Sequence, residues 1–289
     1  MPEVFDRLLG LYAAGLGVVV LFLLLVGWLH LLDELINRRL MRRMGWTGLM
    51  LTGWLGTPVH EGSHVLACWL FGHRVDRVAW FQPDPVNGGL GYVQHSYDRR
   101  NAFQEIGNLF IALAPLLGAG VATLVLMKLL FPEVEIRWGR TPVEEPSATW
   151  WTTLATSVAG AAGVVADVAR QIAAPARWGE WRFWLFLYLA TGLASHAAPS
   201  RADYAAAVRG ILWSGVLLLV GLTLASLSMG LASLVQRGLQ VGLGFTAAYW
   251  VIATAVSLVG LVVVYTATGL WDLLRELFRR EPGDRQRME

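Results

Sequence analysis

Long apolar runs separated by short polar segments make up most of the chain. A membrane-spanning helix needs about 20 mostly apolar residues, and the runs have this length or come close to it. The runs are Leu8–Leu32, Met44–Phe71, Ile106–Phe131, Phe183–Ser200, Gly210–Val235 and Gly244–Leu270. The pattern predicts an all-α polytopic membrane protein with about six transmembrane helices. Acidic Glu3 and Asp6 precede the first run and no small-residue cleavage site follows it, so we expect an uncleaved span.

Two segments between these runs have a different pattern. Arg74–Ser96 contains two short β-prone stretches around a Pro/Asn/Gly cluster, which predicts a small β-hairpin after the second run. Trp150–Ile172 is rich in Gly, Ala, Ser and Thr, and Asp167 and Arg170 interrupt its end. It is long enough to be a seventh span, but we favour an interfacial or partly inserted helix.

The same pattern divides the chain into four parts. An N-terminal transmembrane helix and a basic connector occupy residues 1–43, and a core with the second, third and fourth runs occupies residues 44–209. Two C-terminal transmembrane helices fill residues 210–271, and a basic polar tail follows at residues 272–289. No stretch is long enough for an additional soluble domain.

The composition supports the membrane assignment and narrows the chemistry. Hydrophobic residues make up 55% of the chain and charged residues only 15%, against about 25% charged residues in soluble domains. The mean hydropathy is +0.51, and the net charge of +2 is too small to indicate a nucleic-acid partner. Cys68 is the only cysteine, which excludes an internal disulfide and a zinc cage built from cysteines. We expect Cys68 to be a small buried apolar residue.

The second run contains the sequence HEGSH at residues 60–64, a match to H-E-x-x-H. Residues four apart share a helix face, so His60 and His64 can bind one metal ion. Glu61 lies next to that face, where a carboxylate can take a proton from water at the metal. The motif fixes only three positions, and chance matches are common. Ionisable side chains within a membrane segment are usually functional, however, and no Lys or Arg partner lies in this run, so we expect a metal.

A catalytic zinc site of this type needs a third protein ligand, for which the sequence leaves several candidates. Asp203 follows the fourth run within HAAPSRADY, where Pro199 breaks the helix and the bent segment can fold back. We favour Asp203 as the ligand; its alternative role is a helix N-cap, with Ser200 as the rival cap. His196 is a rival ligand or a neighbour of the ligands or the substrate, and Asp167 is a further candidate.

The topology favours Asp203. With six spans, the second and fourth runs point in the same direction, and His60, His64 and Asp203 all lie in the later part of those runs. If Trp150–Ile172 also crossed the membrane, Asp203 would lie on the opposite side. The other histidines end the first run or lie in the hairpin and are expected to be loop or interface residues: His30, His73 and His95.

From Trp46 to Tyr204 the chain resembles the site-2 protease family of intramembrane zinc metalloproteases. The resemblance rests on HEGSH in a membrane helix, the hairpin-like loop after it, the segment ALAPLLG at Ala112–Gly118 and the Pro-then-Asp segment that ends the third core helix. It implies a Zn²⁺ cofactor, a general base and neighbours of the ligands or the substrate. On this resemblance His60, His64 and Asp203 are the ligands, Glu61 is the general base, and Pro115 and Gly118 lie near the ligands or the substrate. His196 is expected in the same neighbourhood because of its position near the end of the fourth run.

The chain also departs from the family. It reads HAAPSRADY where many members have Asn-x-x-Pro and Leu-Asp-Gly, Gly118 stands where many have an Asn, and there is no room for a PDZ-type domain. The resemblance implies cleavage of a peptide bond in or near a transmembrane segment of a partner, a single-span or membrane-tethered protein. It also implies a multi-pass protein of a membrane, which we expect to be the bacterial cytoplasmic membrane, with the site near its cytoplasmic side.

Other functions remain open on the sequence alone. A prenyl-protein-type membrane protease also carries H-E-x-x-H in membrane helices, but it expects a glutamate ligand, and no downstream run has a Glu in its apolar part. A non-catalytic zinc-binding scaffold or partner-binding module would not need Glu61. A transporter is disfavoured because the ionisable residues lie in one patch rather than along a path.

Overall fold

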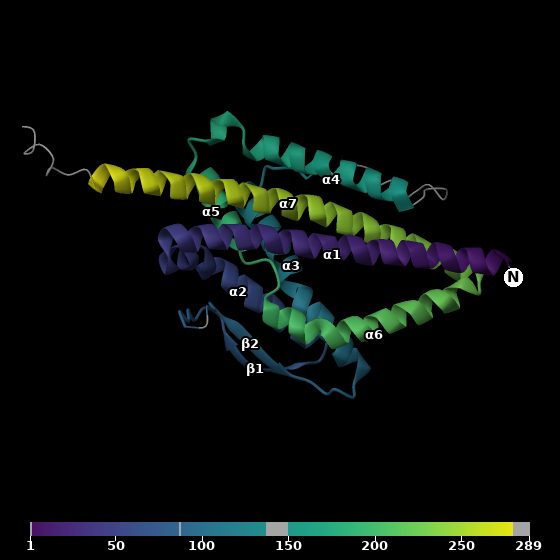
Figure 1. Cartoon of the computed structure of the whole chain (residues 1–289). Helices are drawn as coiled ribbons and strands as arrows, with labels where there is room; N and C mark the ends of the chain where they lie inside the picture. The colour runs from purple at the N-terminus through teal and green to yellow at the C-terminus, as the bar shows by residue number, and fades with distance from the viewer. Residues whose placement is uncertain (1, 87, 137–149, 280–289) are drawn as a thin grey trace, which may run out of the picture.

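The computed structural model describes residues 2–86, 88–136 and 150–279, and most of them are helical (Figure 1). The helices are α1 (Pro2–Met44), α2 (Trp46–Leu70), α3 (Ala102–Leu130), α4 (Trp150–Ile172), α5 (Trp181–Ala194), α6 (Arg201–Ser226) and α7 (Met229–Arg279), with a short 3-10 helix at Pro175–Arg177. Two strands, β1 (Arg74–Ala79) and β2 (Tyr92–Ser96), come between α2 and α3 in the sequence. The predicted combination of a helical chain and a small hairpin after the H-E-x-x-H helix is therefore confirmed.

Four of the described helical segments are long and apolar enough to cross a membrane. They are Val4–Met44, Ala102–Leu130, Ala207–Ser226 and Met229–Glu276. The helix α2 is not among them because glycines, threonines and the HEGSH residues interrupt its apolar character, and α5 has only 14 residues. The chain thus has the helices of a membrane protein, while the count of six spans stays a prediction. So does the interfacial position of α4, which is helical as expected but is not one of the four segments.

The predicted run Phe183–Ser200 is helical only as far as Ala194. Pro199 lies a few residues beyond, and a proline restricts the residue before it to extended conformations and has no N–H to donate. A new helix, α6, starts at Arg201, so Asp203 lies in the first turn of α6 and not on the third core helix, where we had placed it. The boundary predicted between residues 209 and 210 consequently falls inside α6.

The predicted run Gly210–Val235 is also divided. The chain passes from α6 to α7 within it, where the hydroxyl of Ser228 accepts a hydrogen bond of 3.4 Å from the Leu231 N–H and caps the new helix. From there α7 continues to Arg279, so the first part of the predicted polar tail is helical, and residues 280–289 lie outside the described residues.

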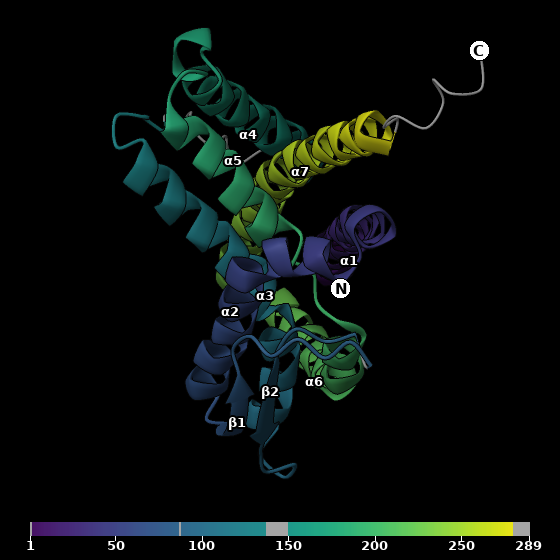
Figure 2. The ribbon, with the colours of Figure 1, turned by 90° about the vertical axis from the view of Figure 1, so that its left-hand side faces the viewer.

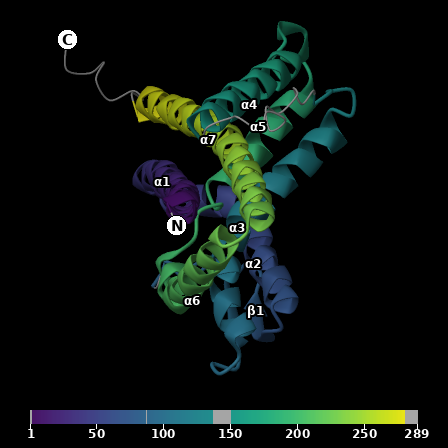
Figure 3. The ribbon, with the colours of Figure 1, turned by 90° about the vertical axis from the view of Figure 1, so that its right-hand side faces the viewer.

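The helices point in two main directions. The long helices α1 and α7 lie side by side, with α4 beside α7 (Figure 1). The helices α2, α3 and α5 pack on one another and cross α1 and α7 steeply, as the views along the long helices show (Figures 2 and 3). Three leucines of α1 form a buried cluster with Leu116 of α3: Leu25, Leu29 and Leu32. This packing brings the second half of α1 against the crossing of α2, α3 and α5.

The two strands form an antiparallel hairpin, as predicted for Arg74–Ser96. Arg74 pairs with Ser96 at the base of the hairpin, and Ala79 pairs with Tyr92 at the other end of the ladder. The end of α2 leads directly into β1, and the hairpin packs against α2 (Figure 2). The position of the hairpin is therefore tied to the helix that carries HEGSH.

Candidate metal centre

The two histidines of HEGSH meet on one face of α2. They are about one helical turn apart, and the Nε2 atoms of His60 and His64 lie 3.1 Å from each other. The side chain of His64 is buried and that of His60 nearly so. The spacing in the sequence therefore produces two imidazole nitrogens that converge on one point.

Asp203 brings a carboxylate to the same point from the first turn of α6. Its Oδ1 lies 3.3 Å from Nε2 of His64, and its Oδ2 lies 3.7 Å from Nε2 of His60. The three ligand atoms lie within 4.8 Å of one another, so this group can hold a metal ion. Ligand atoms around a tetrahedral zinc are about 3.3–3.6 Å apart, because each bond is about 2.0–2.2 Å long. The donor set and its spacing therefore fit zinc after small shifts.

Asp203 also belongs to the cap of α6. The Ser200 hydroxyl accepts a hydrogen bond of 3.3 Å from the Asp203 N–H, and the Ser200 N–H donates one of 2.7 Å to Oδ2 of Asp203. This capping box satisfies two backbone N–H groups at the helix start. Ser200, the rival cap, is thus the N-cap of α6, and Asp203 stands at the third helical position, where its carboxylate completes the capping box and also faces the two histidines.

Backbone carbonyls orient both imidazoles. Nδ1 of His60 lies 2.7 Å from the carbonyl oxygen of His196, and Nδ1 of His64 lies 2.8 Å from that of Ile111. Because a carbonyl oxygen only accepts hydrogen bonds, each Nδ1 carries the proton and each Nε2 presents its lone pair to the shared point. Histidines that bind metals are commonly fixed in this way.

Pro115 explains why the Ile111 carbonyl is available. In an α-helix this carbonyl would accept the N–H of the residue four positions later, but Pro115 stands there inside α3 and has no N–H. The freed carbonyl accepts the Nδ1–H of His64 instead. Pro115, expected as a neighbour of the ligands, thus influences the site through the backbone of α3.

Two glycines allow the close approach of helices that these contacts require. A Cβ added at Gly118 of α3 would lie 1.8 Å from Oγ of Ser63 on α2, a distance that atoms cannot adopt. A Cβ added at Gly56 of α2 would lie 2.3 Å from the carbonyl oxygen of Gly192 on α5. Gly118 is therefore a packing residue that brings α3 close enough for its carbonyl to reach His64.

A cavity of about 540 Å³ adjoins the metal-binding group. Its walls come from α1, α2, α3, the hairpin, the segment between α5 and α6 and the first turn of α6. Glu61 lines this cavity and is 7% exposed. A Cβ at Gly91 would lie 3.1 Å from Cγ of Glu61, so the backbone of the hairpin passes close to this carboxylate. The side chains of His60, His64 and Asp203 and the expected base therefore border one cavity.

Two residues of α1 that sequence reasoning missed hold the segment between α5 and α6. Oδ2 of Asp33 accepts a hydrogen bond of 2.9 Å from the Ala198 N–H, and the amide of Asn37 donates one of 2.8 Å to the Ser195 carbonyl. Both side chains also line the cavity. The predicted first run ends at Leu32, but the helix continues, and a carboxylate directly after an apolar run is the signal that could have identified Asp33.

The rival ligands have other roles. The ring of His196 bonds through Nδ1 to the Ser195 hydroxyl at 3.0 Å, and His196 contributes its carbonyl, not its ring, to the orientation of a ligand. Asp167 bonds to Arg170 and Gln171 on its own helix, α4. Neither residue is in the metal-binding groups found among the described residues. The structure thus assembles the favoured set and leaves His196 beside it.

Comparison of the chain with protein-family models gave no match, and comparisons with curated proteins and with solved structures gave none either. The function must therefore be argued from the geometry of the site.

Proposed function

We propose that the protein is an intramembrane zinc metalloprotease that hydrolyses a peptide bond in or near a transmembrane segment of a partner protein. The observation that carries this proposal is the convergence of His60, His64 and Asp203 on one point, beside Glu61 and next to a cavity. Three protein ligands leave one coordination position free, which is typical of catalytic zinc sites, whereas structural sites use four. The resemblance of residues 46–204 to the site-2 protease family supports the same reading.

Each residue has a defined task in this proposal. His60, His64 and Asp203 hold the zinc, which when bound activates water and polarises a carbonyl group. Glu61 accepts the proton of the attacking water and delivers it to the nitrogen of the departing amine. The surrounding helices limit the access of bulk water, which strengthens the interaction of these charges with a developing negative charge.

The hairpin supports an extended substrate. A peptide bond within a helix is shielded by the helix's own hydrogen bonds, so a transmembrane substrate has to unwind before it is cut. Residues 88–93 line the cavity close to Glu61, and a two-stranded sheet has outer edges whose backbone groups can pair with an added strand. We infer that a single-span or membrane-tethered substrate binds in extended form beside the hairpin.

The membrane arrangement belongs to the same proposal. We infer six crossings, in which α2 and α5 cross together with the four apolar segments, and α4 lies at the membrane surface. An even number of crossings places both ends of the chain on the same side of the membrane. We infer that this is the cytoplasmic side of a bacterial cytoplasmic membrane and that the site lies near it. Reporter fusions before α1 and after α7 would then both report a cytoplasmic location, and a split result would contradict the six-crossing arrangement.

The experiment that tests the proposal is Glu61→Gln in the full chain, co-expressed with a library of single-span membrane proteins. We expect cleavage to fall by at least about 10²-fold, because general-base catalysis is lost, while the zinc content stays unchanged because Glu61 is not a ligand. Glu276→Gln on the exposed face of α7 is the matched control and should cleave normally. Equal cleavage by the wild type and the Glu61 variant would refute the mechanism.

The same experiment separates the alternatives. A zinc scaffold predicts full zinc content and no cleavage product in the wild type. A prenyl-protein-type protease predicts products only from prenylated partners and expects a glutamate as third ligand. The carboxylate beside both histidines belongs to Asp203, an aspartate, which favours the site-2 reading.

A further inference from the structure

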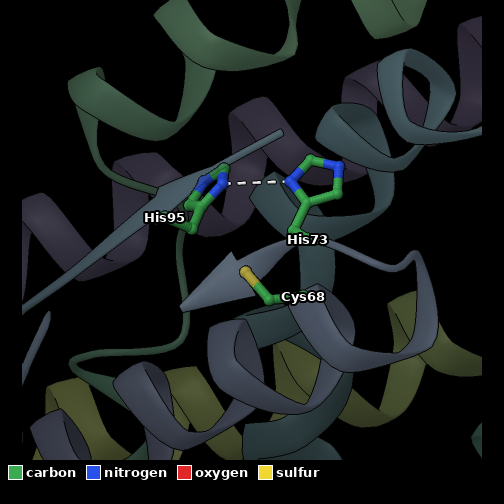
Figure 4. A group of neighbouring side chains, drawn as sticks. All are labelled: Cys68, His73 and His95. Atoms are coloured by element: carbon green, nitrogen blue, oxygen red, sulfur yellow. Dashed lines mark hydrogen bonds between the residues drawn. The ribbon is translucent and has the colours of Figure 1, made fainter. Parts of the chain in front are cut away.

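A second group of ligand side chains lies one turn farther along α2. Cys68 follows His64 by four residues, and with His73 and His95 it forms a group whose ligand atoms lie within 4.8 Å of one another. Figure 4 shows the Cys68 sulfur directed toward the two imidazoles. We propose that Cys68, His73 and His95 bind a second metal ion of the zinc class, which fastens the hairpin to α2 and α3. This proposal does not depend on the hydrolytic activity proposed above.

The ring of His73 has the tautomer that a metal ligand needs. Its Nε2 lies 2.8 Å from the carbonyl oxygen of Gln104 in α3, so Nε2 carries the proton and Nδ1 presents a lone pair. The residue is 4% exposed, and its ring stacks on Tyr97 at 4.8 Å between centroids. A carbonyl of α3 thus orients His73 in the same way that another carbonyl of α3 orients His64. His73 lies in the loop between α2 and β1, as expected, and it is buried there.

His95 completes the imidazole pair from β2. Its Nδ1 lies 3.0 Å from Nδ1 of His73, so in the absence of a metal His95 donates the proton of this hydrogen bond. With a metal between the two Nδ1 atoms, His95 carries its proton on Nε2 instead.

Cys68 supplies the donor that distinguishes this group from the first one. Its side chain is fully buried in an apolar cluster with Ala67 and Ile111, as expected from the sequence. A thiolate together with two imidazoles suits zinc, cobalt or copper and not magnesium or calcium, which prefer oxygen ligands. The chemistry of the donor set therefore selects a transition metal.

The position of the group suggests what the ion does. Cys68 lies near the end of α2, His73 immediately precedes β1, and His95 lies in β2, so an ion would join both strands at the base of the hairpin to the helix. The other end of the hairpin passes close to Glu61 in the cavity. A metal at the base would hold the hairpin at a constant position relative to that cavity.

Cobalt binding tests this proposal, because Cys68 is the only cysteine of the chain. A Co²⁺–thiolate bond gives a charge-transfer absorption band in the near ultraviolet, and only this group can produce it. We expect the metal-free full chain in detergent to bind a second equivalent of Co²⁺ or Zn²⁺ and to show the band. In Cys68→Ser both the band and one equivalent should disappear, while the His60→Ala/His64→Ala variant should lose one equivalent and keep the band.

A further variant tests the proposal even if Cys68→Ser does not fold. His95→Gln keeps the thiol but removes one imidazole, and it should bind the second equivalent more weakly and change the band. A wild-type chain that binds a single equivalent without the band would overturn the proposal. So would a band that disappears in the His60/His64 variant and persists unchanged in His95→Gln, because Cys68 would then belong to the first group.

Discussion

The two candidate metal groups of this protein use the same helix in different ways. In the first group α2 supplies His60 and His64, and α6 supplies Asp203 from far along the chain. In the second group all three ligands come from residues 68–95, around the start of the hairpin. In both groups a carbonyl of α3 orients an imidazole. Only the first group has a buried carboxylic acid, Glu61, next to its ligands in the sequence.

This difference indicates what separates a hydrolytic centre from a structural one. The first group combines an oxygen ligand, a neighbouring base and a cavity, which together permit the activation of water. The second combines a thiol and two imidazoles at the joint between a helix and a hairpin, where a metal would fix the backbone. The orientation of the histidine rings is common to both, so it prepares metal binding in general and does not select a reaction.

The largest difference between the two groups is expected from Asp203→Ala. It removes a ligand, so metal binding at the first group should fall by more than the factor of about 10–100 that the loss of an orienting partner costs. Cleavage should fall with it, whereas the cobalt–thiolate band of the second group should remain. Zinc analysis and the absorption spectrum measure both groups in one sample.

Asp203→Asn is the matched control for this change. It keeps an oxygen that can accept the Ser200 N–H, so the start of α6 should survive, which circular dichroism can report. Loss of both metals in Asp203→Ala but not in Asp203→Asn would mean that the two groups form one coupled unit. Full zinc retention in both variants would remove Asp203 from the site.

A smaller effect on the first group is expected from Pro115→Ala. The new N–H would compete for the Ile111 carbonyl, and His64 would lose its orienting partner, so zinc affinity should fall about 10–100-fold. The helix should at the same time become more stable, by up to about 3 kcal/mol, because an internal proline is removed. Chelator competition and thermal unfolding measure these opposite changes.

The second group is the internal control for Pro115→Ala, because His73 is oriented by Gln104, outside the region that Pro115 affects. Its cobalt band should be unchanged. An unaltered zinc affinity at the first group would show that the Ile111 carbonyl keeps its bond to His64 without help from the proline.

The smallest effect on metal binding is expected from Gly118→Ala. The new Cβ would collide with the Ser63 hydroxyl, and the chain should lose about 1–3 kcal/mol of stability through overpacking of α2 against α3. Zinc affinity should fall by less than about tenfold, because a shift of α3 away from α2 would lengthen the hydrogen bond between His64 and the Ile111 carbonyl without removing its acceptor. Thermal unfolding and chelator competition give the two values.

Two further variants make the Gly118→Ala result specific. Adding Ser63→Gly removes the colliding atoms and should restore part of the lost stability. Gly163→Ala on α4 meets no atom within 4 Å and should be neutral or slightly stabilising. Equal destabilisation at positions 118 and 163 would argue against close packing as the cause.

Sequence reasoning succeeded where the determining interactions are local. The pair His60 and His64 follows from the helical repeat, and the hairpin follows from a Pro/Asn/Gly cluster between β-prone stretches. It misplaced the boundary between the last two helices: the predicted run Gly210–Val235 extends across the junction of α6 and α7, where the Ser228 hydroxyl caps α7, and a hydropathy pattern does not detect such a cap. It also placed Asp203 on the wrong helix, although it selected the residue.

The sequence by itself determined that this chain has the helices of a membrane protein, that two histidines share a helix face and that Glu61 lies beside them. Only the tertiary structure decided that Asp203 meets those histidines, because the contact depends on the turn after α5 and on the hydrogen bonds from α1 that hold it. It also decided that His196 and Pro115 act through backbone carbonyls. The group that donates a hydrogen bond to each of these carbonyls comes from another helix, so the sequence does not identify it.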